Sequence, residues 1–222
     1  MRNIQISVGE HYHVYNRGTH KNTIFHDRTD YSRFLFLIVF LQSPVSFDPI
    51  SRRVRFFVEH SVFEIDEGEV MEISDKRYVD LVSFCLMPNH FHLILKETEE
   101  GGTARYMQRV LNGYTKYYNT KYGISGHLFQ GPYKAVHVED NDQLLYLSTY
   151  VHRNPRELSG WKNKEQKYEW SSYQDYINSN RWGKLLSTEI VLGQFQLNAE
   201  NEYDEFVQTS SAKLIDNEVQ DS

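Results

Sequence analysis

Four segments of the chain carry the alternating or apolar pattern of β-strands. The first alternates, is rich in residues that favour strands, and is ended by Gly18. The second and third are joined by Pro88-Asn89, a dipeptide that favours a turn. The sequence therefore predicts strands over His11 to Arg17, 78–86, 91–96 and 133–138.

Three longer segments predict helices, each with a start and a stop signal. The first, from about Asp30 to Gln42, is heavily apolar and is expected to be buried. In the second, apolar residues recur at helical spacing on one face. The predicted caps and stops are Thr29 and Pro44, Thr103 and Gly123, and Asp140 and Asn154-Pro155.

Residues 43–77 predict a small acidic β-hairpin inserted between the first helix and the second strand. Val54 to Val58 and Val62 to Ile65 have strand composition, and Val70 to Ile73 is expected to pair back after a turn at Asp66-Glu67-Gly68. Within this segment, Glu59 to Asp75 holds seven acids and no lysine or arginine.

The order of the elements predicts an α+β fold. An antiparallel sheet with helices packed on one face is expected, close to the split βαβ arrangement. We expect one domain over residues 1–180, with the hairpin insertion at 43–77, followed by a C-terminal extension over 181–222. From about residue 196 the composition favours a mobile acidic tail.

The distribution of charge changes the meaning of the net charge of −6. Residues 196–222 hold seven acids and one base, so the rest of the chain is balanced. Residues 101–138 contain no acid, and their bases alternate with tyrosines and phenylalanines, as in a groove for single-stranded nucleic acid. An ordinary solvated helix face with a tyrosine-rich core side is the alternative. Bases of this interval include Arg105, Arg109, Lys116 and Lys134.

Cysteine count and hydropathy place the chain inside the cell. Cys85 is the single cysteine, which excludes an internal disulfide. The longest apolar run, Phe34 to Leu41, is too short to span a bilayer, and no signal peptide is visible at the start. We therefore expect a cytoplasmic protein without a membrane partner.

Two histidines on the third strand are candidates for metal binding. Side chains alternate along a strand, so His90 and His92 share one face and Phe91 takes the other. Two imidazoles on one rigid strand can share a metal ion, although further ligands must come from elsewhere. His11 and His13 form a second pair of the same spacing, so chance is a real alternative.

The last helix can supply the second half of a site. Tyr146, Tyr150 and Asn154 follow at intervals of four and share one helix face. Asn154 could offer a carbonyl oxygen to a metal ion and Tyr150 a hydroxyl. A phenol is a poor nucleophile by itself, but a divalent cation can neutralise charge in the transition state of attack on phosphorus. Tyr150 could equally be a packing residue, since the chain has 16 tyrosines.

Several stretches together resemble the single-tyrosine HUH transposases, the IS200-like group, and within it the REP-associated tyrosine transposases. They appear in family order over about residues 11–176. The matching stretches are Tyr12 to Gly18, Asp30 to Leu35, Cys85 to Leu93, His127 to Ala135, Tyr150 to Pro155 and Trp170 to Tyr173.

The resemblance implies a role for each matched residue. His90 and His92 would be the HUH metal ligands on an HUH endonuclease fold, Asn154 the third ligand and Tyr150 the nucleophile. The implied reaction is nicking of single-stranded DNA beside a hairpin through a 5′-phosphotyrosine, with Mg²⁺ or Mn²⁺; imidazoles would also accept zinc. His13 matches the family pattern but is not counted as a ligand. Expected DNA contacts are Arg17, Arg105, Arg109, Lys116, Gln130 and Lys134.

Two other functions stay open from the sequence. One is a metal-dependent nuclease that hydrolyses DNA through a bound water, with Tyr150 only structural. The other is a non-catalytic DNA- or RNA-binding protein on the same scaffold. A homodimer is also open, because related enzymes can complete a site with a tyrosine from a partner subunit.

Overall fold

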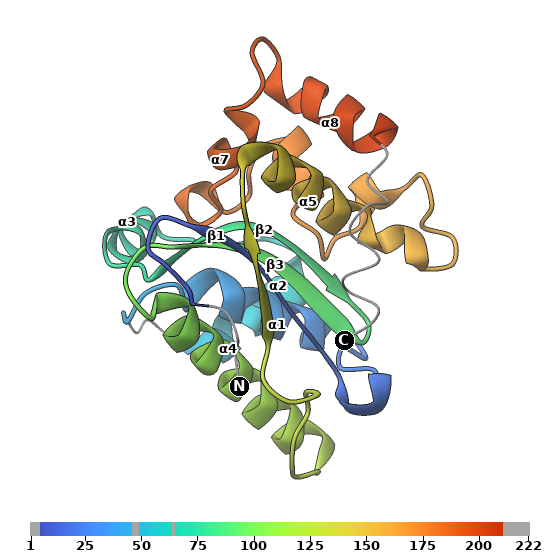
Figure 1. Cartoon of the computed structure of the whole chain (residues 1–222). Coiled ribbons are helices and arrows are strands. Elements are labelled where there is room, and N and C mark those ends of the chain that lie inside the picture. Colours follow the sequence, from blue (N-terminus) through green and yellow to red (C-terminus); the bar gives the residue numbers. More distant parts are fainter. Residues whose placement is uncertain (1–4, 46–48, 64, 211–222) are drawn as a thin grey trace.

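A four-stranded antiparallel sheet organises the computed structural model, which describes residues 5–45, 49–63 and 65–210 (Figure 1). The strands follow the order β2-β3-β1-β4 across the sheet. Each agrees with a predicted segment to within one residue at either end. Their bounds are β1 (His11–Arg17), β2 (Val79–Met87), β3 (His90–Glu97) and β4 (Lys134–Val138).

The register of the sheet sets which side chains share a face. In β3, His92 lies opposite Tyr15 of β1 and Cys85 of β2. His90 lies opposite Arg17 and Met87 in the same way. Paired residues in an antiparallel sheet point to the same face, so both histidines face the side on which Arg17 and Tyr15 lie.

Helices α1 (Arg28–Phe40) and α4 (Gly102–Tyr122) lie against one face of the sheet (Figure 1). Both helices begin earlier than predicted, and their first N–H groups are bound by other residues than the predicted caps. Asp27, not Thr29, caps α1 by accepting from the backbone N–H of Asp30. Thr103 lies inside α4, and the buried carboxylate of Glu97 accepts from the N–H groups of Gly102 and Thr103 instead. A side chain from a neighbouring strand thus satisfies the orphan donors of α4.

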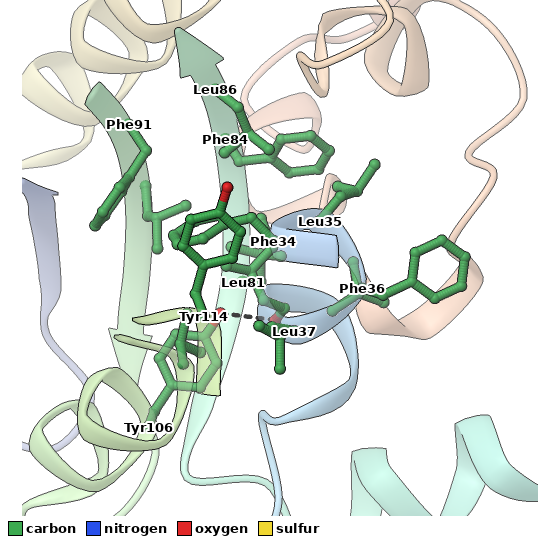
Figure 2. Packing of buried hydrophobic residues seen from close by; sticks show 14 of the residues in the cluster. Phe34, Leu35, Phe36, Leu37, Leu81, Phe84, Leu86, Phe91, Tyr106 and Tyr114 are labelled. Atoms are coloured by element: carbon green, nitrogen blue, oxygen red, sulfur yellow. Dashed lines mark hydrogen bonds between the residues drawn. The ribbon is translucent and has the colours of Figure 1, made fainter. Parts of the chain in front are cut away.

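The larger core lies between these two helices and the sheet. Figure 2 shows Phe34, Leu35 and Leu37 of α1 beside Leu81, Phe84 and Phe91 of the strands, with Tyr106 and Tyr114 coming from α4. Phe91 is fully buried and its ring centre lies 4.9 Å from that of Phe34. The residue between the two histidines therefore anchors β3 to the core.

Helix α5 (Asn141–Arg153) lies on the opposite face of the sheet, as Figure 1 shows. The expectation of helices on one face alone was wrong, although the α+β class and antiparallel sheet are confirmed. Val82, Cys85, Met87 and Ile94 form an apolar strip on this second face, and α5 covers it. A sheet that is apolar on both faces needs cover on both.

The predicted hairpin at 43–77 was also wrong. The chain forms α2 (Ile50–His60) and α3 (Glu67–Asp75) there. Ile50, Val54, Phe57 and Val58 recur at helical spacing, and Val54 and Phe57 are buried against α1. Asp66 caps α3 by accepting from the N–H of Glu69, so the predicted turn is a helix start.

The segment beyond residue 180 packs on the body of the protein rather than forming a tail from residue 196. Trp182 is buried in the larger core. In α8 (Ala199–Thr209), Tyr203 and Val207 are buried, which corrects the expected mobility of this part. Residues 211–222 of the predicted tail lie outside the described residues. The remaining elements are η1 (Thr19–Lys21), η2 (Asn154–Glu157), η3 (Glu165–Lys167), α6 (Tyr173–Ile177), η4 (Gly183–Leu185) and α7 (Glu189–Leu192).

The longest helix described, α4, is tied to α1 by a cluster of polar side chains. The carboxylate of Asp30 is fully buried and accepts from the hydroxyls of Tyr117 (2.9 Å) and Tyr122 (2.6 Å). The ammonium of Lys121 lies 2.6 Å from the same carboxylate. Over the part of the chain that the structure covers, no helix is both long and apolar enough to cross a membrane.

We expect Asp30→Ala to lower the free energy of unfolding by about 3 kcal/mol. The hydroxyls of Tyr117 and Tyr122 and the backbone N–H of His26 lose their acceptor, and Lys121 keeps only Asp27. Urea denaturation measures the change. Asp27→Ala is the matched control: it removes another carboxylate that contacts Lys121 (2.7 Å), but one that is about half exposed, so about 1 kcal/mol is expected. Equal losses in the two variants would contradict the central role of Asp30.

Candidate active site

His90 and His92 lie on β3, beneath the C-terminal half of α5. Their ring centres are 5.1 Å apart. His92 is buried and His90 is partly buried at the end of the strand. The strand is held on both sides by its neighbours and below by Phe91, so the two imidazoles stand on a rigid support.

Helix α5 brings Tyr150 and Asn154 to the same place. The ring centre of Tyr150 lies 5.4 Å from that of His92, edge to face, and the side chain is half-buried. The amide oxygen of Asn154 lies 3.3 Å from Nε2 of His90. The structure therefore assembles, within one chain, the four residues that the sequence singles out for metal binding and nucleophilic attack.

The hydrogen bonds of His90 fix which ring nitrogen carries the proton. Nδ1 lies 2.7 Å from the amide oxygen of Asn89, whose own amide nitrogen donates to the carbonyl of Lys21 (3.1 Å). That oxygen can only accept, so Nδ1 of His90 must donate. Burial lowers the pKa of His90 to about 4, so the ring is neutral near pH 7 and its Nε2 bears a lone pair.

A second acceptor faces that lone pair. The amide nitrogen of Asn154 donates to the carbonyl of Tyr150 (3.2 Å), which turns the amide oxygen toward Nε2 of His90. Two acceptors 3.3 Å apart repel unless a cation lies between them. Imidazole nitrogen and amide oxygen are both ordinary ligands of divalent ions, so this donor set fits a metal.

His92 is oriented by His13 of β1. Nε2 of His13 lies 2.8 Å from Nδ1 of His92, so the two rings share one proton. Burial lowers the pKa of His13 to about 3 and holds the pKa of His92 well below its usual value, so both rings are neutral. When Nδ1 of His92 donates to His13, its Nε2 is left bare for a ligand role. An imidazole held by such a contact is typical of metal sites.

A cavity of about 350 Å³ opens beside these residues. Its wall includes His90, His92 and Tyr150 together with the basic side chains of Arg17 and Lys21. Two cations next to neutral imidazoles favour an anionic ligand such as a phosphodiester. The sequence did not point to three further wall residues: Lys21, Asn89 and Glu157. They lie in turns or short helices, where no periodic pattern indicates which way a side chain points.

Three of the six expected DNA contacts lie near this cavity. Arg17 lines it directly. Gln130 is exposed, and its backbone N–H donates to the carbonyl of Arg17 (2.9 Å). Lys134 is exposed at the start of β4, where it lies opposite Tyr15, another residue of the cavity wall. These three could follow one strand of nucleic acid toward Tyr150.

The other three expected contacts lie on α4, on the opposite side of the sheet from α5 (Figure 1). Arg105 pairs with Glu99 and covers the ring of Tyr78. Arg109 donates to the carbonyls of Leu41 and Ser43 at the end of α1. Lys116 is exposed. The structure does not bring these residues to the cavity that holds the histidines.

The aromatic residues of the same interval serve mainly in the core. Tyr106, Tyr114 and Tyr118 are buried, and the hydroxyl of Tyr117 is bound to Asp30. Of the two interpretations of this interval, the structure supports the packed face for these tyrosines. Spacing alone does not distinguish them, because a helix that packs on a sheet and a helix that stacks bases both need aromatic residues on one face.

Comparisons with known proteins point to one group of transposases. The model of the family described as IS200-like transposase matches residues 50–154, which include the histidine pair and Tyr150 and end at Asn154. A search of curated proteins gives no significant match.

Among solved structures, the chain is similar to a REP-associated tyrosine transposase bound to a REP hairpin. The similarity covers 90% of this chain and 94% of the other, with a TM-score of 0.50 and 12% sequence identity. At this identity the match shows the fold, which is the fold that the resemblance in the sequence implies. That resemblance is confirmed: residues 50–154 match the model of the IS200-like transposase family, and the fold is similar to that of a REP-associated tyrosine transposase.

Proposed function

We propose that this protein nicks and rejoins single-stranded DNA beside a hairpin, with Tyr150 as the nucleophile and a divalent cation held by His90, His92 and Asn154. The observation that carries the proposal is the juxtaposition at the end of β3. A half-buried tyrosine stands edge to face with His92, one of two neutral histidines, and the other, His90, faces an amide oxygen that needs a cation.

The reaction follows from the chemistry of a phenol beside a phosphodiester. The hydroxyl oxygen of Tyr150 attacks phosphorus, and the phenolic proton leaves as the new O–P bond forms. The bond from phosphorus to the 3′ oxygen breaks, and that oxygen takes up a proton. The product is a 5′-phosphotyrosine and a free 3′ hydroxyl. Because the phosphotyrosine retains a phosphodiester linkage, a different 3′ hydroxyl can reverse the step, which suits strand transfer.

Mg²⁺ and Mn²⁺ fit the proposed ligand set of two imidazoles and one amide oxygen, and zinc would be accepted as well. Such an ion polarises the phosphoryl oxygen and neutralises charge in the transition state. The chain's own part is to hold the ligands neutral and oriented. Asn89 and His13 do this for His90 and His92 by bonding to Nδ1 of each ring.

Substrate binding is assigned to the basic rim of the cavity. Arg17, Gln130 and Lys134 are the proposed contacts near the nucleophile, and Lys21 joins them from the cavity wall. Arg105, Arg109 and Lys116 would contact DNA only on the opposite face of the sheet. The hairpin bound by the structural relative supports a hairpin-bearing strand as the first substrate to test.

We expect the protein to form a covalent adduct with hairpin-bearing single-stranded DNA from beside its own gene when Mn²⁺ or Mg²⁺ is added. Tyr150→Phe should abolish the adduct, and His92→Ala should reduce its rate at least about 100-fold because a metal ligand is lost. A denaturing gel measures both. Tyr146→Phe is the matched control, since this tyrosine lies one turn earlier on α5 and should react within about threefold of the wild type.

Each other outcome supports a different function. Cleaved DNA without adduct, retained in Tyr150→Phe, indicates a hydrolytic nuclease. Tight binding that tolerates His90→Ala and His92→Ala, with no cleavage in any variant, indicates a binding protein on the same scaffold. An adduct that persists in Tyr150→Phe contradicts the assignment of the nucleophile.

We expect His13→Phe to weaken Mn²⁺ binding about 10- to 100-fold, because His92 loses the contact that orients its ring. The free Mn²⁺ signal in electron paramagnetic resonance titrations gives the affinity. His11→Phe makes the same change on the same face of β1, two residues earlier, and should leave the affinity within about twofold. Equal losses in both variants would show a general effect of β1 rather than orientation of His92.

A further inference from the structure

One buried histidine on α5 has no part in the proposed chemistry. His152 is fully buried, between Tyr150 and Asn154 in sequence. Its Nε2 lies 2.8 Å from the hydroxyl of Ser172, and its Nδ1 lies 2.7 Å from the hydroxyl of Tyr203 on α8. Both residues next to His152 in this network, Ser172 and Tyr203, come from beyond the part of the chain that matches the family model.

The hydrogen bonds at both ends of this network give it a direction. At one end the backbone N–H of Phe84 on β2 donates to Ser172 (2.9 Å). At the other end Ser148 donates to the carbonyl of Leu145 (2.7 Å), so its oxygen accepts from Tyr203 (3.0 Å). Because the hydroxyl proton of Tyr203 is donated to Ser148, the Tyr203 oxygen must accept the hydrogen bond from Nδ1 of His152.

His152 therefore carries its proton on Nδ1. Its bare Nε2 accepts from Ser172 at 2.8 Å, which is closer to that hydroxyl than its other acceptor, the carbonyl of Phe84 at 3.2 Å. The Ser172 oxygen takes the N–H of Phe84. A neutral imidazole has one donor and one acceptor, as this direction requires. The opposite tautomer would leave the 3.0 Å contact between Tyr203 and Ser148 without a proton.

This chain of hydrogen bonds joins α5 to β2 on one side and to α8 on the other. Arg153 adds to the second attachment by donating to the carbonyls of Gln208 and Ser210 at the end of α8. Successive residues of a helix are about 100° apart, so His152 points roughly away from Tyr150 and from Asn154, each two residues distant. The hydrogen bonds of His152 therefore hold α5 on the side opposite Tyr150 and Asn154.

We propose that His152 and Tyr203 are positioning residues, which fix the rotation of α5 so that Tyr150 and Asn154 face His90 and His92. The role in catalysis rests on the proposed function, whereas the attachment of α5 does not. A small rotation of α5 would move the Tyr150 hydroxyl away from the phosphorus and Asn154 away from His90 together. Misplacement of a reacting group by about 1 Å can cost about 100-fold in rate.

The test compares two tyrosine-to-phenylalanine variants around α8. Tyr203→Phe removes the hydroxyl that contacts His152 and Ser148 and keeps the aromatic ring. Tyr173→Phe is the matched control. The hydroxyl of Tyr173 donates to Asp204 of α8 (2.5 Å), which is not part of the hydrogen-bond network of His152, and the ring still stacks on His152 in the variant. Three quantities are measured: hairpin affinity, the single-turnover rate of adduct formation, and amide hydrogen exchange of residues 144–153.

We expect Tyr203→Phe to slow adduct formation about 10- to 100-fold with hairpin affinity within about twofold, and to raise exchange in α5. Tyr173→Phe should keep the wild-type rate and exchange. Ser172→Ala breaks the same hydrogen-bond network on the β2 side. In the double variant, the rate of adduct formation should therefore fall by less than the product of the two single-variant effects. Long-range nitrogen–proton NMR of the wild type should show the proton of His152 on Nδ1.

Two results overturn the inference: a proton on Nε2 of His152, or equal slowing and equal exchange in Tyr203→Phe and Tyr173→Phe. A wild type that forms no adduct, yet shows the Nδ1 tautomer and the exchange difference, overturns the proposed function instead and leaves the attachment of α5 standing. The two failures are therefore distinguishable.

Discussion

The packing of α5 on the sheet is the constraint on which the rest of this structure depends. Leu144, Leu147 and Val151 are buried on the second face, against Val82 of β2 and Ile94 of β3. The histidine pair stands on β3 and the proposed nucleophile on α5, and Tyr150 follows His92 by 58 residues in the sequence. Neither element alone holds a site. Because the apolar face of α5 is buried on the sheet, the remaining face delivers Tyr150 and Asn154 to the end of the strand.

Burial then sets the chemistry of the histidines. It lowers the pKa values of His13, His90 and His92, so the rings remain neutral, the form in which imidazole binds a metal. The acceptors Asn89 and Asn154 on the two sides of His90 cannot both be satisfied by a single ring proton. The lone pairs on Nε2 of His90 and on the amide oxygen of Asn154 therefore face each other, and a divalent cation bound by both would remove their repulsion. Structural metal sites and catalytic ones share this preparation, and the half-buried tyrosine beside it is what favours catalysis here.

The strands, the helices α1, α4 and α5, and the meeting of His90 with Asn154 could be predicted from the sequence. Alternation, turn residues and the Asp140 cap act locally, and the i, i+4 register of Tyr150 and Asn154 is fixed by helix geometry. The helices α2 and α8 were missed because β-branched residues and a high acid content outweighed their helical spacing, which Tyr203 and Val207 show plainly once burial is known. The contact of His13 with His92 depends on strand order, and the attachment of His152 depends on where α8 lies. Neither is encoded in local spacing.

The central claim is that one chain assembles the metal ligands beside its own Tyr150. Its most direct test is a crystal structure of the protein grown with Mn²⁺, with anomalous diffraction to locate the ion. We expect one anomalous peak per chain, at an ion bound by Nε2 of His90, Nε2 of His92 and the amide oxygen of Asn154. The Tyr150 hydroxyl of the same chain should be directed toward that ion. A peak at another set of side chains, or a site completed by α5 of a second molecule, would contradict it.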